Sequence, residues 1–62
     1  MDRQQAVMNF IHENFFAEAV RIEPCSLFPY GLRVIDKSND EMVVYFDLLT
    51  DSVQYVFPDK VG

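Results

Sequence analysis

Several residue types that support extracellular or membrane proteins are scarce in this 62-residue sequence. It has one cysteine, so no intramolecular disulfide can form, and small secreted domains usually depend on such crosslinks. The first residues show no basic region followed by an apolar run, which a signal peptide would need. No apolar run approaches the length of a membrane span. We therefore expect a cytoplasmic protein that does not bind membranes.

Motifs that carry chemistry are also missing. Only two glycines are present, with no phosphate-binding glycine loop and no Cys/His metal spacing. Cys25 and His12 are the only candidates for a thiol–imidazole pair, and nothing in the pattern brings them together. Residues 36–41 with Asp47 loosely follow a calcium-loop spacing, but Glu41 stands where that loop needs glycine. The sequence predicts no enzyme, no cofactor and no metal site.

Basic residues are few. Ten acidic and five basic residues give a formal net charge of −5. Direct nucleic-acid binding is not expected, because neutralising phosphates supplies most of the affinity of nucleic-acid-binding proteins. The negative charge suits a protein partner with a basic surface, and it also leaves open a nucleic-acid mimic. By analogy of size alone, such small acidic chains are found among accessory, inhibitor and phage proteins.

Apolar residues, in contrast, are plentiful: half the chain is hydrophobic and 15% is aromatic, so we expect one folded domain over residues 1–62. An amphipathic helix is predicted over residues 3–17. Asp2 and Gln5 fit a capping box at its start. The helix presents one apolar stripe at helical spacing, made of Val7, Met8, Phe10, Ile11 and Phe15.

Short β-rich segments separated by polar turns follow the helix. A loop over residues 18–31 includes a possible short strand at 20–23, and strands are predicted at 32–36, 41–48 and 52–57. Pro58 closes the last strand, and residues 58–62 form a tail. The predicted fold class is α+β: one N-terminal amphipathic helix packed on one face of an antiparallel β-meander of three strands, or of four if residues 20–23 form a strand.

The alternating pattern divides the strands into two faces. We place Lys37 opposite Glu41 in the first hairpin and Leu48 opposite Val53 in the second. The face predicted to lie under the helix carries Leu32, Val34, Met42, Val44, Phe46, Leu48, Val53, Tyr55 and Phe57. The other face carries an apolar set, Ile35, Val43, Tyr45 and Val56, with Arg33, Glu41 and Asp47 at its rim. We call these seven residues the predicted patch.

An apolar cluster with a charged rim is typical of protein interfaces. The alternatives are that these residues reflect strand propensity alone, or that residues 20–28 fold over them. Residues 24–30, which include two prolines, predict either a binding loop or a core plug that buries Leu27 and Phe28. The leading hypothesis is a non-catalytic interaction module that binds a partner protein through the predicted patch. The alternatives are a homodimeric structural domain without an outside partner, and an acidic mimic that blocks a DNA- or RNA-binding protein.

Overall fold

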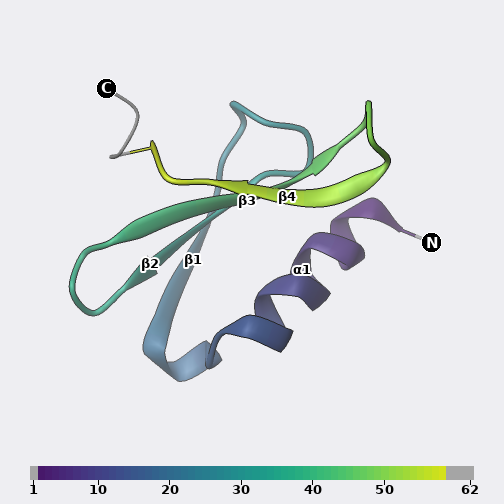
Figure 1. Ribbon diagram of the computed structural model, residues 1–62. Coiled ribbons are helices and arrows are strands. Elements are labelled where there is room, and N and C mark those ends of the chain that lie inside the picture. Colours follow the sequence, from purple (N-terminus) through teal and green to yellow (C-terminus); the bar gives the residue numbers. More distant parts are fainter. Residues whose placement is uncertain (1, 59–62) are drawn as a thin grey trace.

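A computed structural model describes residues 2–58 and shows one helix packed on a four-stranded antiparallel sheet (Figure 1). The elements are α1 (Arg3–Asn14), a 3-10 turn η1 (Ala17–Ala19), β1 (Val20–Pro24), β2 (Leu32–Asp36), β3 (Glu41–Asp47) and β4 (Ser52–Val56). The strands lie in the order β1-β2-β3-β4, so each pairs with its neighbour in the sequence. The predicted α+β meander is confirmed, with the short strand at residue 20 as its fourth member. No helix within residues 2–58 is long and apolar enough to cross a membrane.

The start of α1 differs in detail from the predicted capping box. The Asp2 carboxylate accepts a hydrogen bond from the Gln4 backbone N–H at 2.9 Å, and the Gln5 side chain donates to Asn9 Oδ1 at 3.0 Å instead of reaching back. The helix ends at Asn14 rather than at residue 17. Phe15 adopts an extended backbone there, which turns its ring toward the core.

Both hairpins are offset by two residues from the predicted register, which is wrong in this respect. Glu41 lies opposite Ile35 rather than Lys37, and Val53 lies opposite Phe46 rather than Leu48. Because side chains alternate with a period of two, this offset leaves every paired residue on its predicted face.

Carboxylate-capped turns cause the offset, since they take up more residues than the predicted turns. The Asp36 carboxylate accepts from the backbone N–H groups of Ser38 and Asp40, at 2.8 and 3.0 Å. The Asp47 carboxylate accepts from the Leu49 N–H at 2.9 Å. This second turn includes Leu48, which is exposed, so its predicted place in the core is wrong.

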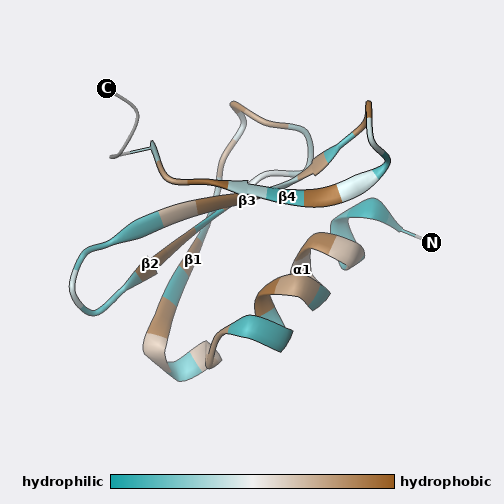
Figure 2. Ribbon diagram, viewed as in Figure 1, coloured by the Kyte–Doolittle hydropathy of each residue, from teal (hydrophilic) through white to brown (hydrophobic). Residues whose placement is uncertain are grey.

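The core lies between α1 and the sheet. Its buried members are Val7, Ile11, Val34, Met42, Val44 and Phe46, surrounded by the partly buried Ala6, Phe10, Phe15, Val20, Ile22, Leu32 and Val53. Figure 2 shows these apolar positions along the middle of α1 and the central strands. Each fully buried side chain of this size contributes about 1.5–3 kcal/mol to stability. The helix packs mainly against β3 and only lightly against β4, which leaves part of the sheet's helix-facing side uncovered.

Candidate functional site

The structure places the apolar members of the predicted patch together on the sheet face away from α1. Val43 and Val56 are paired across β3 and β4, and Tyr45 follows two residues along β3. However, Val43 is only 2% exposed and Ile35 9% exposed, while Tyr45 and Val56 are half-buried. Ile35 and Val43 are therefore buried within the chain, although the leading hypothesis needs them at the surface.

Part of this face, around Tyr45, is covered by the loop of residues 25–31, which joins β1 to β2 on the side of the sheet opposite α1 (Figure 1). The Phe28 ring stacks on Tyr45, with ring centroids 4.7 Å apart and an interplanar angle of 27°. The Pro29 carbonyl accepts a hydrogen bond from the Phe46 N–H at 3.0 Å, which fastens the loop to β3. The loop is thus a plug through Phe28. Leu27, which a plug was predicted to bury as well, is 82% exposed.

The next residue of this loop, Tyr30, lies on the helix side of the sheet. Its backbone has a positive φ of 54°. Its ring lies nearly perpendicular to the Phe46 ring, with the ring centroids 6.4 Å apart. The Gln4 side chain donates to the Tyr30 carbonyl at 3.3 Å. Phe28 and Tyr30 therefore contact β3 side chains on opposite faces of the sheet, with the Pro29 backbone bonded between them.

A close backbone approach at Gly31 closes the loop. The Cys25 N–H donates to the Gly31 carbonyl at 3.0 Å, and the Gly31 N–H donates to the Phe28 carbonyl at 3.1 Å. A Cβ at position 31 would lie 2.6 Å from the Cys25 carbonyl oxygen. Glycine is needed here for space, since its backbone φ is not positive.

The charged rim of the predicted patch is also engaged within the chain. Arg33 lies 3.3 Å from Glu41 and 3.6 Å from Glu23, and Glu23 in turn lies 3.0 Å from Arg21. The Arg33 Nε contact with Glu41 is an ion pair without hydrogen-bond geometry. Partly exposed pairs of this kind contribute about 0–1 kcal/mol each. Asp47 caps the β3–β4 turn, so Arg33, Glu41 and Asp47 all have partners within this fold.

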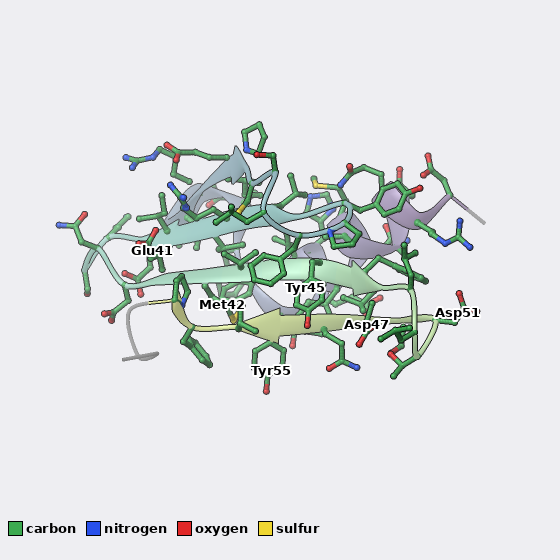
Figure 3. The ribbon with its side chains drawn as sticks, turned by 90° about the horizontal axis from the view of Figure 1, so that it is seen from above. Glu41, Met42, Tyr45, Asp47, Asp51 and Tyr55 are labelled. Carbon is green, nitrogen blue, oxygen red and sulfur yellow. The ribbon has the colours of Figure 1, made fainter. Side chains whose placement is uncertain are left out.

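A different apolar surface is open to solvent, on the helix side of the sheet beside β4. Tyr55 is 52% exposed and Phe57 46% exposed, although both lie on the face predicted to be core. The Tyr55 ring stacks with the Phe10 ring, with centroids 6.2 Å apart, and lies edge-on to the Phe57 ring, with centroids 5.7 Å apart. A hollow runs between α1 and β4, lined by Phe10, Asn14, Phe15, Met42, Tyr55 and Phe57. We call it the aromatic groove; Figure 3 shows Tyr55 projecting beyond the outer edge of β4.

One helix is too narrow to cover this sheet, and this is why the groove is open. A helix with its side chains is about 10 Å wide, whereas four strands spaced about 4.8 Å apart extend over about 14 Å. The alternation of side chains along a strand assigns Tyr55 and Phe57 to the face under the helix, so the sequence did not indicate that they are exposed. The prediction of a single helix for a sheet of up to four strands could have indicated that some residues on this face stay exposed.

Carboxylates adjoin the groove near the β2–β3 turn. A second hollow is lined by Phe15, Val34, Met42 and Phe57 together with Asp36, Asp40 and Glu41. Within residues 2–58, neither Asp36 nor Asp40 takes part in an ion pair. At the other end of β4, the exposed Asp51 directly precedes the strand. The groove therefore has an apolar floor and negative charge at both ends of its strand.

The structure locates the candidate metal ligands, the one cysteine and the one histidine. Over residues 2–58 no group of three or more His, Cys, Asp or Glu side chains is arranged to hold a metal ion. Cys25 is buried and His12 is exposed, and no hydrogen bond joins the two. The chain matches no protein-family model, and neither a curated protein nor a solved structure shows significant similarity to it.

Proposed function

We propose that this protein is a small non-catalytic module that binds another protein through the aromatic groove. The supporting observation is the pair of half-exposed rings, Tyr55 and Phe57, set beside Phe10 in a hollow with an acidic rim. Aromatic side chains dominate binding energy at protein interfaces, where they fill desolvated centres surrounded by polar rims. The net charge of −5 favours a partner with a basic surface, because opposite potentials steer association. A cytoplasmic accessory or inhibitor role belongs to the same proposal.

The groove is a better candidate than the predicted patch because it needs no rearrangement. Val43 is buried, and a partner that used the neighbouring Tyr45 would first have to displace Phe28 from its ring. Tyr55 and Phe57 can be contacted without moving any other described residue. Interface residues that are already exposed in the free protein avoid this cost of opening.

Affinity capture from the native host tests the proposal, with three lysine variants side by side. Tyr55→Lys places a charge in the groove, Tyr45→Lys places one on the opposite face, and Leu27→Lys is a matched control at an exposed apolar residue outside both. We expect a partner identified by mass spectrometry to be lost with Tyr55→Lys and kept with Leu27→Lys. Loss with Tyr45→Lys and retention with Tyr55→Lys would move the interface to the predicted patch. Melting curves of each variant exclude unfolding as the cause.

A homodimeric structural domain is the second candidate, and the free edge of β4 favours it. Strand β4 lies at the end of the sheet order, so one side of its backbone has no strand partner among residues 2–58. Two such edges can pair with each other about a two-fold axis. Sedimentation equilibrium over a range of concentrations, with wild type and Tyr55→Lys, tests this alternative, because a dimer through β4 would dissociate in the variant.

A further inference from the structure

The outer edge of β4 presents unpaired backbone groups at defined residues. The Phe46 N–H points away from β4, since it bonds to the Pro29 carbonyl. In an antiparallel ladder, the residue opposite such a position also points away from its partner strand. Val53 lies opposite Phe46, so Val53, and by alternation Tyr55, direct their N–H and C=O groups outward. These groups are available to a further strand.

The two edges of the sheet are protected to different degrees. Strand β1 carries Arg21, Glu23 and Pro24, and charges and proline are the usual means of preventing edge-to-edge pairing. Strand β4 has the sequence SVQYV, with neither a charge nor a proline. Of the two edges, β4 is therefore the one suited to accept another strand.

The aromatic groove lies directly beside this edge. Tyr55 contributes both an outward backbone and a ring in the groove, and Phe57 continues the same row of side chains. A strand added to β4 would alternate its own side chains above and below the sheet. Its helix-side residues would enter the groove against Phe10 and Tyr55, so backbone pairing and apolar burial would occur together.

Charge decides between a second copy of this chain and a foreign segment. In an antiparallel pair of β4 strands, the start of one strand lies beside the end of the other. That arrangement would bring Asp51 of one copy toward Asp36 and Asp40 of the other. Like charges brought together across strands are destabilising. A segment with lysine or arginine at its ends would instead be attracted at both ends.

We propose that β4 and the aromatic groove bind an extended segment of a partner protein as a fifth strand. The segment has alternating apolar residues that enter the groove and basic residues at its ends. Recognition of this kind combines main-chain hydrogen bonds for affinity with pockets for alternate side chains. The proposal rests on the assignment of the groove as a protein-binding surface, and it adds the conformation and chemistry of the partner.

Selection from a random peptide library displayed on phage tests this directly, with the full chain immobilised as bait. We expect enriched peptides with alternating apolar residues and a lysine or arginine near each end. Titration calorimetry then compares an enriched peptide with two N-methylated forms, each modified at every second amide. One form should bind about tenfold or more weakly, because it loses two or more strand-pairing bonds, and the other should bind as before.

Protein variants complete the test and separate the two proposals. Tyr55→Lys should abolish peptide binding, and Leu27→Lys should leave it unchanged. Enriched peptides that bind equally well in both N-methylated forms, yet still lose binding to Tyr55→Lys, would overturn strand addition while supporting the groove. Failure of the library to yield any enriched peptide would also overturn strand addition. The capture experiment with Tyr55→Lys tests separately whether the groove binds a protein. A wild-type dimer that Tyr55→Lys dissociates would show that a second copy occupies the edge, and would overturn this proposal.

Discussion

Both faces of the sheet carry apolar residues, and the two faces are covered in different ways. The face away from α1 has no helix, yet Val43 is buried there and the 25–31 loop stacks Phe28 on the neighbouring Tyr45. The face that does have a helix leaves Tyr55 and Phe57 half-exposed beyond the reach of α1. The comparison shows that the width of the covering element, and not its presence, decides which apolar residues stay accessible.

The largest effect is expected from a charge at the centre of the loop-covered face. Val43→Asp would bury a carboxylate opposite Arg33, which is already paired with two glutamates, so the change should cost about 3 kcal/mol or more and unfold much of this small domain. Urea denaturation followed by circular dichroism measures the loss. Leu49→Asp, at a residue that is 97% exposed, is the control and should change little. A stable Val43→Asp variant would contradict the burial of Val43 on this face.

Gly31→Ala should have the next largest effect. Its Cβ would lie 2.6 Å from the Cys25 carbonyl oxygen, so the backbone must move and the loop must shift from β3. We expect a loss of about 1–3 kcal/mol, which is in the range of overpacked sites. Thermal melting gives the stability, and near-ultraviolet circular dichroism reports whether Tyr45 keeps its packed environment. An unchanged melting curve would contradict the tight closure between Cys25 and Gly31.

A double-mutant cycle measures the contact that holds the loop on the sheet. Phe28→Ala and Tyr45→Ala each remove one ring of the stacked pair. Their coupling energy should be about 0.5–1.5 kcal/mol, the usual value for an aromatic pair beyond area burial. Leu27→Ala with Tyr45→Ala forms the control cycle and should show no coupling, because Leu27 is exposed. Equal coupling in both cycles would remove the distinction between the neighbouring residues.

The smallest effect on stability is expected in the aromatic groove. Tyr55→Lys should change the free energy of unfolding by less than about 1 kcal/mol, since the ring is half-exposed and its loss leaves no cavity. Urea denaturation beside Val43→Asp makes the comparison of the two faces direct. A destabilisation as large as that of Val43→Asp would mean that Tyr55 belongs to the core. That result would contradict the proposal that the groove is a binding surface.

The fold was largely predictable because its signals are local. The helical stripe containing Val7 and Ile11 predicted α1, and polar turn residues at 37–40 and 49–51 separated the predicted strands. The predicted faces are correct although the predicted register is wrong, because an offset of two residues leaves each side chain on the same face of the sheet. The binding surface was not predictable in the same way. The alternation along a strand predicts on which face of the sheet Val43 and Tyr55 lie, but it does not predict which other segments pack against them.

The sequence by itself determined the helix, the strand alternation and the acidic charge, because each depends on residues close together in the chain. Tertiary structure decided the exposure of each apolar residue. Phe28 reaches Tyr45 only through the closure of the 25–31 loop at Gly31, and Tyr55 remains open because α1 packs under β3. Burial depends on which distant segments come into contact, and that is set by the width and path of the covering elements rather than by the alternation within a strand.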